Sequence, residues 1–208
     1  MARGTFSASN YFRTGTALIT DVPLTMACWF YQTSASNDTL VLHEANTTDI
    51  HRIRAGSGST VTASSFKDGP FVGGTSTTGT FSLNVWNHAA GVFASSSSRT
   101  AYLNGTAATT ETTNVPVPTL VRAGVGATYA GGSPLSGYLA AVGIWNVALD
   151  AAEIAALAKG FSPHLIRRAS LVHHMPLIRG SRDLRGNMVE VGTVPVVVHP
   201  PIIGAIAV

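Results

Sequence analysis

Acidic side chains are the residues of this sequence best suited to catalysis, because most glycoside hydrolases work with two carboxylates at a fixed separation. The ten Asp and Glu residues are scattered, and the closest pair along the chain is Asp150 and Glu153. Those two have the spacing of a helix capping box, in which each side chain caps the backbone of the other residue. The acids therefore predict no catalytic pair, and we expect a protein that is not an enzyme.

Metal ligands are sparse in the sequence. Asp38, Glu44 and Asp49 fall in one stretch and could supply oxygen ligands for calcium; the alternative is that they are solvated turn residues. His173 and His174 are adjacent, with His164 nearby, but neighbouring residues of a strand point to opposite faces and cannot easily chelate one ion. We therefore expect no resident cofactor, with calcium as the alternative, and histidines that are partly buried or at an interface.

Other catalytic motifs are missing from the sequence. It has no G-x-S-x-G turn of an α/β-hydrolase, and the run GVGATYAGG lacks the lysine and the following helix of a phosphate-binding loop. The single cysteine, Cys28, lies in an apolar run and is expected to be a buried thiol. A lone cysteine excludes an internal disulfide and a cysteine-based zinc site.

Aromatic residues offer a different chemistry, the stacking of sugar rings. The candidates for such a platform are Trp29, Tyr31, Trp86, Tyr129, Tyr138 and Trp145. At strand spacing, we expect these rings to pack in the core or on a sheet face. The alternative is a platform for sugar rings, for which the rim aromatic Tyr129 is the expected glycan contact.

Composition limits the partners of the chain. Its 208 residues carry 13 Lys and Arg, 10 Asp and Glu, and a formal net charge of +3. Residues 1–160 hold eight bases and eight acids, so the excess lies in residues 161–208. A nucleic-acid-binding face needs clustered Lys and Arg, a membrane span needs about 18 apolar residues, and a secretory signal needs an apolar stretch near the N-terminus. The sequence has none of these, so we expect neither nucleic acid nor a membrane as a partner.

Strands must position most of these residues. Period-two alternation broken by Gly, Asn and Ser predicts an all-β chain, as in residues 24–33, where Leu24, Met26, Cys28 and Phe30 share one face. One helix is expected after Asp150, ending at Gly160. The expected strands are 4–12, 24–33, 39–44, 49–55, 60–67, 80–83, 86–94, 99–103, 120–127, 137–145 and 188–192.

The last part of the chain, residues 161–208, combines arginines with an apolar, proline-broken end. We expect an extended arm rather than a second domain, because a segment of this size struggles to bury its own core. An exposed apolar arm favours contact with a partner; the alternative is that the arm folds back on its own sandwich and the arginines are solvated. The expected partner contacts are Arg167, Arg168, Arg179, Arg182, Val196, Val198, Ile202, Ile203 and Ile206.

Three segments resemble the concanavalin A-like jelly roll, in its laminin-G-like and pentraxin-like branch. They are FSASNYFRTG followed by PLTMACWFYQT, then VWNHAAGVFASSSSRTAYLNGTAA, then GYLAAVGIWNVALDAAEIAALAKG. The resemblance covers residues 4–160 and implies an antiparallel jelly-roll β-sandwich with one short helix. The chain is therefore expected to have a laminin-G-like sandwich over residues 1–160 and a C-terminal extension over residues 161–208, packed on the sandwich and on neighbouring subunits.

The segment GFSPHLIRRASLVHHMPLIRGSRDLRGN, followed later by VHPPII, resembles the C-terminal extension of stand-alone laminin-G-like proteins of tailed bacteriophages. Together with the apolar arm, this resemblance predicts a non-enzymatic virion structural protein, a capsid decoration or accessory subunit that acts through protein–protein interfaces. It implies a homo-oligomer, with a trimer as one form, and a major capsid or other virion protein as neighbour. The expected location is the virion, after assembly in the host cytoplasm. The alternative is a carbohydrate-binding, lectin-like module for host or glycan attachment.

Overall fold

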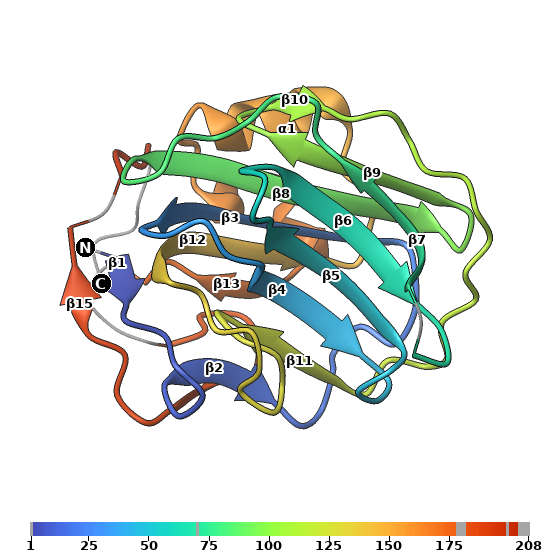
Figure 1. The fold of residues 1–208 in the computed structure, drawn as a ribbon, viewed down its shortest axis with the longest axis horizontal. Helices are drawn as coiled ribbons and strands as arrows, with labels where there is room; N and C mark the ends of the chain where they lie inside the picture. The colour runs from blue at the N-terminus through green and yellow to red at the C-terminus, as the bar shows by residue number, and fades with distance from the viewer. Residues whose placement is uncertain (1, 70, 178–181, 199, 204–208) are drawn as a thin grey trace.

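Two antiparallel sheets packed face to face form the molecule (Figure 1), and the computed structural model describes residues 2–69, 71–177, 182–198 and 200–203. One sheet contains β1 (Ala2–Gly4), β3 (Leu24–Gln32), β8 (Trp86–Ser95), β9 (Ser98–Leu103), β10 (Thr106–Ala107), β12 (Gly137–Trp145), β13 (Leu171–Met175) and β15 (Val196–Val197). The other contains β2 (Tyr11–Thr14), β4 (Asp38–Glu44), β5 (Ile50–Ala55), β6 (Val61–Phe66), β7 (Phe71–Ser76), β11 (Arg122–Val125) and β14 (Val189–Val191). The predicted all-β sandwich is confirmed.

The strand order puts distant parts of the chain side by side. The eight-stranded sheet runs β10-β9-β8-β3-β12-β1-β15, with β13 also paired to β12, and the seven-stranded sheet runs β14-β2-β11-β4-β5-β6-β7. In β3 the alternation sends Leu24, Met26, Cys28 and Phe30 into the core between the sheets, where all four are fully buried. The intervening residues of β3 therefore lie on the outer face of the eight-stranded sheet.

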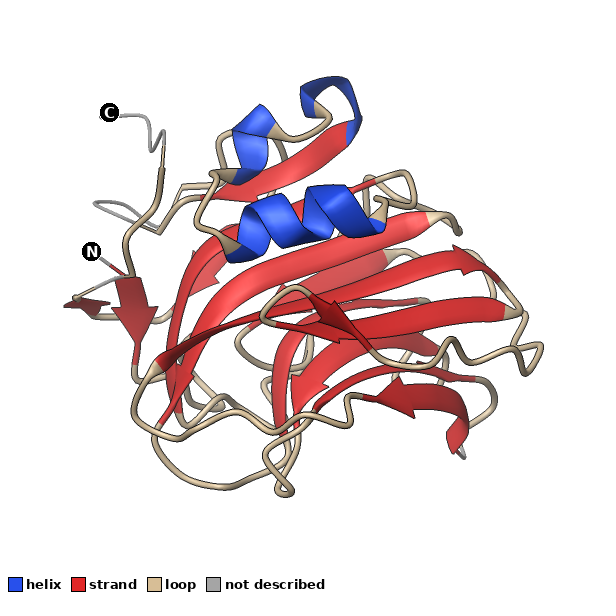
Figure 2. Cartoon of the chain, turned by 90° about the horizontal axis from the view of Figure 1, so that it is seen from above, coloured by secondary structure: helices blue, strands red, loops and turns tan. Residues whose placement is uncertain are grey.

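The helix α1 (Ala151–Ala158) lies on that outer face (Figure 2). Its predicted capping box is confirmed, because the Asp150 carboxylate accepts from the Glu153 amide at 2.9 Å and Glu153 accepts from the Asp150 amide at 2.8 Å. Ile154 and Leu157 bury the inner side of α1 against a small apolar cluster of the sheet. Two short 3-10 turns, η1 (Pro163–Leu165) and η2 (Arg168–Ser170), follow. None of the helices in the described part of the chain has the length and apolar character to span a bilayer.

The segment after residue 160 extends both sheets. β13 pairs with β12, β14 pairs with β2, and β15 pairs with β1. The strand expected at 188–192 is confirmed as β14, whereas β13 and β15 were not predicted. Met175, Leu177 and Val194 are fully buried in this molecule's own core. The segment thus folds back on its own sandwich over much of its described length.

Two predicted strands differ from the structure, and one strand of the same region was not predicted. Residues 4–12 hold parts of two strands, β1 and β2, one in each sheet. Residues 80–83 form no strand. The strand of this region is β7, which was not predicted because adjacent glycines such as Gly73 and Gly74 are typical of a turn. Gly73 is required there because a Cβ would lie 2.2 Å from a guanidinium nitrogen of the buried Arg99. Tertiary contact therefore decides the position of this strand rather than local pattern.

Candidate functional site

Three aromatic side chains form a row across the outer face of the eight-stranded sheet. The register places Trp86 of β8 opposite Tyr31 of β3, and Tyr31 opposite Tyr138 of β12. The ring centroids of Trp86 and Tyr31 are 5.7 Å apart, and those of Tyr31 and Tyr138 are 5.1 Å apart. All three side chains are half-buried, so their rings rest on the sheet and stay open to solvent.

A fourth aromatic ring, Trp29, extends the row along β3. It lies two residues from Tyr31 on the same face and contacts His88 edge to face, with ring centroids 5.7 Å apart. His88 is almost fully buried, and burial lowers its pKa to about 3, so the ring is neutral near pH 7. We call Trp29, Tyr31, Trp86 and Tyr138 the aromatic face.

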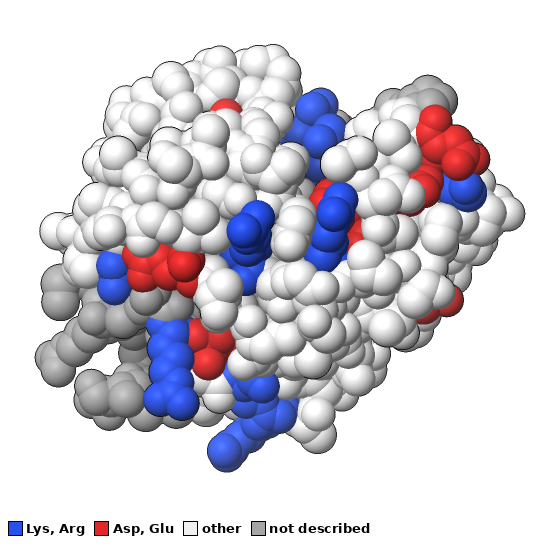
Figure 3. Space-filling view, turned by 90° about the horizontal axis from the view of Figure 1, so that it is seen from below, with Lys and Arg blue, Asp and Glu red and all other residues white. Residues whose placement is uncertain are grey.

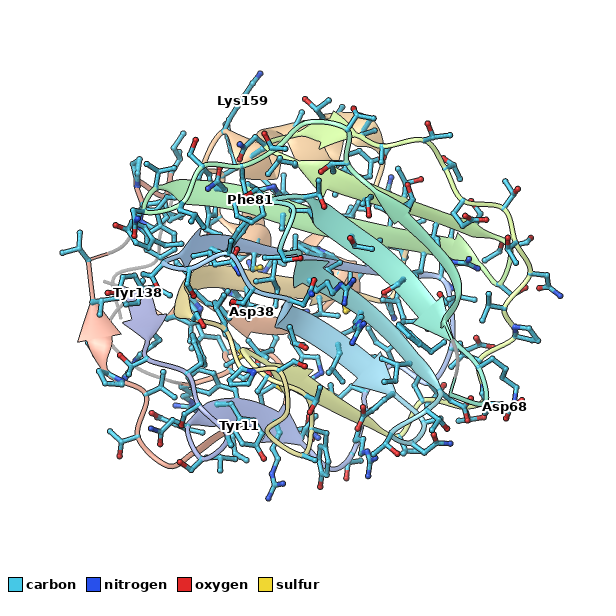
Figure 4. All side chains as sticks on the ribbon, in the orientation of Figure 1. Tyr11, Asp38, Asp68, Phe81, Tyr138 and Lys159 are labelled. Atoms are coloured by element: carbon cyan, nitrogen blue, oxygen red, sulfur yellow. The ribbon has the colours of Figure 1, made fainter. Side chains whose placement is uncertain are left out.

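Neighbouring small residues decide which half of the sheet stays open. Beyond Trp29 the outer positions of β3 and β8 are Ala27 and Ala90, which give room for α1 to pack. At the other end, a Cβ on Gly4 of β1 would lie 1.9 Å from the Tyr138 ring. The Tyr138 ring therefore lies across the backbone of β1, and Figure 4 shows Tyr138 beside β1, far from Lys159 at the end of α1.

The polar atoms of the aromatic face are free to meet a ligand. The hydroxyl groups of Tyr31 and Tyr138 and the indole nitrogen of Trp86 make no hydrogen bond to any residue that the structure describes. Strands β3, β8 and β12 contain no Asp or Glu. The face is thus an uncharged platform with hydrogen-bonding groups at its ring edges, on which the Trp86 ring is inclined by 65° and the Tyr138 ring by 32° to the ring of Tyr31.

Two aromatic residues that the sequence grouped with this row lie elsewhere. Trp145 is fully buried and donates its indole N–H to the carbonyl of Ile166 at 2.8 Å. Tyr129, the expected glycan contact, belongs to a loop over the seven-stranded sheet, with the guanidinium groups of Arg13 and Arg122 at 4.9 and 4.5 Å from its ring centroid. Tyr129 therefore takes no part in the aromatic face. The sequence prediction missed Gly4 and His88, because only strand pairing puts them beside the rings.

The three calcium candidates are not gathered into one site. Asp38 and Glu44 are the first and last residues of β4. The Asp38 carboxylate accepts from Gln32 and from the Ser136 amide, both at 2.8 Å, and Glu44 accepts from Arg122 at 2.7 Å. Asp49 accepts from the Asp68 amide at 2.7 Å, and Figure 4 shows Asp68 far from Asp38.

In the described residues no three His, Cys, Asp or Glu side chains are grouped to hold a metal ion. The shared calcium site is therefore wrong as a prediction for Asp38, Glu44 and Asp49, because local partners hold each carboxylate. His173 and His174 point to opposite sides as expected: the Nδ1 of His173 lies 2.6 Å from buried Asp183, and His174 packs against His164. Burial raises the pKa of the Cys28 thiol well above its usual range.

The residues expected to contact a partner lie in two different places. Arg167 and Arg168 are exposed beside α1, where Arg167 pairs with Glu153. On and after the edge strand β15, Val196 is 41% exposed and Val198 is 83% exposed. Of the rest, Arg182 and Ile203 are exposed, Ile202 is half-buried, and Arg179 and Ile206 lie outside the described residues. Of the described residues, Arg167 and Arg168 beside α1 are thus separate from Val196 and Val198 at the β15 edge.

Comparisons with known proteins bear on the fold. The family model described as "Concanavalin A-like lectin/glucanases superfamily" matches residues 6–155. No curated protein matches the chain by sequence.

Solved structures with the same fold share little sequence with this chain. A putative carbohydrate binding protein from Bacteroides ovatus superposes with a TM-score of 0.70 at 16% identity, covering 97% of this chain and 61% of that one. Domain 4 of AbnA, a GH43 extracellular arabinanase from Geobacillus stearothermophilus solved in complex with arabinotriose, gives 0.62 at 16% identity, covering 75% and 76%. A SAP-like pentraxin from Limulus polyphemus gives 0.58 at 16% identity, covering 72% and 75%.

Proposed function

We propose, from the premise that this chain belongs to the concanavalin A-like lectin/glucanases superfamily, that it is a carbohydrate-binding module whose aromatic face holds an uncharged sugar chain. The observation that carries the proposal is the open row of Trp86, Tyr31 and Tyr138 across three neighbouring strands. Strand spacing of about 4.8 Å gives the row a length of about 10 Å. A platform of that length supports more than one sugar ring.

Sugar rings suit this platform because of their two kinds of surface. The C–H face of a pyranose is apolar and slightly positive, and the face of an aromatic ring carries the negative part of its quadrupole. Hydroxyl groups at the sugar's edge find the phenol and indole groups at the edges of Tyr31, Tyr138 and Trp86. Large aromatic side chains with two rotatable bonds also lose little entropy when a ligand covers them.

Binding is favoured over hydrolysis by the charge of the face. Retaining and inverting glycosidases place two carboxyl groups on either side of the scissile bond. The three strands of the row carry no acid, and His88 stays neutral through burial. One of the solved structures with this fold, the arabinanase domain, is described in complex with a sugar, arabinotriose.

The test is a glycan array followed by titration calorimetry on the best ligand, with the variants Trp86→Ala and Tyr31→Ala. Each variant is expected to weaken neutral-glycan binding by about 2 kcal/mol, or roughly thirtyfold, as for aromatic hot spots. Tyr129→Ala, which removes a half-buried aromatic from the other sheet, is the matched control and should bind like the original protein. An array without neutral-glycan hits, or equal losses in Trp86→Ala and Tyr129→Ala, would contradict the proposal.

A second proposal is the structural role predicted from the C-terminal segment, in which the chain is a virion subunit that associates with copies of itself. Its support is the exposure of Val196 and Val198 at the sheet edge formed by β15. An unpaired apolar edge strand is a natural place for another chain to add. Sedimentation of the protein and of Val198→Asp should show an oligomer that the variant loses. A monomer in both cases would remove this proposal and leave the first untouched.

A further inference from the structure

Two arginines of β5, Arg52 and Arg54, lie side by side on the outer face of the seven-stranded sheet. Their neighbour Ile53 is fully buried in the core, so the alternation of the strand sends both arginines outward. Two residues along a strand place side chains about 7 Å apart on one face. That spacing lets two guanidinium groups approach one small ligand from two sides.

Neither arginine has a partner for its charge. In the part of the chain that the structure describes, no carboxylate lies within ion-pairing distance of Arg52 or Arg54, and neither guanidinium donates a hydrogen bond. Among the described residues, Arg52 makes a cation–π contact instead, with its guanidinium carbon 4.5 Å from the centroid of the Phe66 ring. The Nε atoms of both arginines are covered from solvent without an acceptor.

Buried hydroxyl groups without partners surround the pair. The register places Thr39 of β4 opposite Arg54 and Ser64 of β6 opposite Arg52, on the same face. Each of these two side chains is 1% exposed, and neither Oγ has a hydrogen-bond partner in the described structure. Unsatisfied buried polar groups are uncommon in folded proteins because each costs free energy. Four such atoms lie at adjacent positions of three strands, next to the terminal guanidinium nitrogens of Arg52 and Arg54, which have no acceptor among the described residues and stay open to a ligand.

The rest of the face is also basic. Arg13 of β2 and Arg122 of β11 point to the same side, and Glu44, which pairs with Arg122 at 2.7 Å, is the only acid at the described strand positions of this face. Burial and the neighbouring charge of Arg54 lower the pKa of Arg52 to about 10, so it is still charged at neutral pH. We call Arg13, Arg52, Arg54 and Arg122 the arginine face. From below, the side of β2 and β11 in Figure 1, several Lys and Arg side chains stand on a mostly uncharged surface, with Asp and Glu side chains beside some of them (Figure 3).

We propose that Arg52 and Arg54 bind the oxyanion of an acidic sugar, the carboxylate of a uronic acid or a sulfate ester. Planar guanidinium groups match such oxyanions with paired, charge-assisted hydrogen bonds. The choice of a sugar acid rather than another anion rests on the proposed function. The same sandwich is proposed to bind carbohydrate through the aromatic face on its opposite side, so an acidic carbohydrate is the anion that fits both faces.

The test compares three polymers by affinity electrophoresis and calorimetry: polygalacturonate, dextran sulfate and neutral dextran. The double variant Arg52→Gln/Arg54→Gln should weaken binding of a charged polymer by about tenfold or more, in line with the loss of charge-assisted hydrogen bonds. The matched control is Arg168→Gln/Arg182→Gln, which removes two exposed charges from the C-terminal segment and should keep the original affinity. Preference for polygalacturonate identifies the carboxylate, and preference for dextran sulfate identifies the ester.

Several results would overturn this inference. Equal losses in the two double variants would show a diffuse effect of net charge, and tighter binding of a DNA oligonucleotide than of either polymer would make the ligand a nucleic acid. If the double variant fails to fold, the thermal midpoint of the original protein decides: it must rise with oligogalacturonate or a sulfated oligosaccharide, and no rise with either refutes the site. Trp86→Ala should keep charged-polymer binding, so failure of the aromatic face and failure of the arginine pair give different results.

Discussion

The two outer faces of the sandwich are built by the same alternation of residues and differ in almost everything else. On the eight-stranded sheet, half of the face is covered by α1 and the open half carries uncharged aromatic rings. On the seven-stranded sheet, the strands present arginines, two of which have no counter-charge in the described structure. The core positions behind both faces are similarly apolar. The outward residues, rather than the fold, therefore decide which ligand each face can bind.

The difference also separates two physical sources of affinity. Stacking on Trp86 and Tyr31 depends on contact area and ring geometry, which ions in solution leave unchanged. An oxyanion between Arg52 and Arg54 depends on charge, which salt screens. A change in salt concentration should therefore alter ligand affinity at the arginine face and leave ligand affinity at the aromatic face unchanged.

Acid should have the largest effect, because it removes the scaffold that both faces share. Burial lowers the pKa of His43, His51 and His88 to about 3 and that of His174 to about 4. The unfolded chain protonates these rings near pH 6.5 while the folded chain does not, so stability is full above pH 6.5 and falls as pH decreases. Each ring contributes up to about 1.4 kcal/mol per pH unit. By pH 5 the sum exceeds about 5 kcal/mol, comparable to the whole stability of a domain.

Thermal unfolding between pH 8 and pH 4 measures this effect. His43→Leu should reduce the slope of stability against pH, because both ring nitrogens of His43 are buried without a partner. His164→Gln, at a half-exposed site, should change the slope less. A thermal midpoint that stays constant from pH 7 to pH 5 would contradict the assignment. It would also mean that any loss of binding in acid comes from the faces themselves.

Salt should have the next largest effect and should act on one face alone. The screening length falls from about 10 Å at 0.1 M to about 3 Å at 1 M salt. Binding of a charged sugar by Arg52 and Arg54 should therefore weaken by about tenfold over this range, because salt screens the attraction between the guanidinium groups and the oxyanion. Neutral-glycan binding by the aromatic face should change by less than about twofold. Calorimetry with both ligands on one protein preparation makes the comparison, and equal salt dependence would show that the two ligands share a face.

Much of the fold could be predicted from local pattern. Strict alternation located β3, β-rich runs between turn residues located β8 and β12, and the Asp150–Glu153 spacing located α1, because these signals involve near neighbours in the chain. β13 and β15 were missed because His173-His174 and the proline-broken end show no alternation; their pairing with β12 and β1 defines them. The virion role and the division at residue 160 stay predictions.

The candidate site was only partly predictable, for a related reason. Trp29, Tyr31, Trp86 and Tyr138 were among six aromatic candidates, and no pattern within one strand tells which rings meet across strands. The register of β3 against β8 and β12 brings them together, and it is a long-range property. Arg52 and Arg54 stood among eight scattered bases of residues 1–160. Their missing partners are visible only once the strands on both sides are placed.

A single methyl group on Gly4 should have the smallest effect and give the finest test of the aromatic face. The Cβ of Gly4→Ala would overlap one edge of the Tyr138 ring, from Cγ to Cε1, so the ring should turn away while β1 stays paired. Neutral-glycan affinity is expected to fall by about threefold to tenfold, as for the loss of part of a stacking contact, with charged-sugar affinity unchanged. Gly58→Ala is the matched control, because nothing lies within 4 Å of its added Cβ.

The double variant Gly4→Ala/Tyr138→Ala separates a displaced ring from a general loss of stability. If the methyl group acts only through the Tyr138 ring, it should cost nothing further in glycan affinity once the ring is removed, which a double-mutant cycle measures directly. If the losses add instead, Gly4 matters for β1 and β15 at the sheet edge rather than for the ring. The aromatic face would then end at Tyr31, and the row would span two strands in place of three.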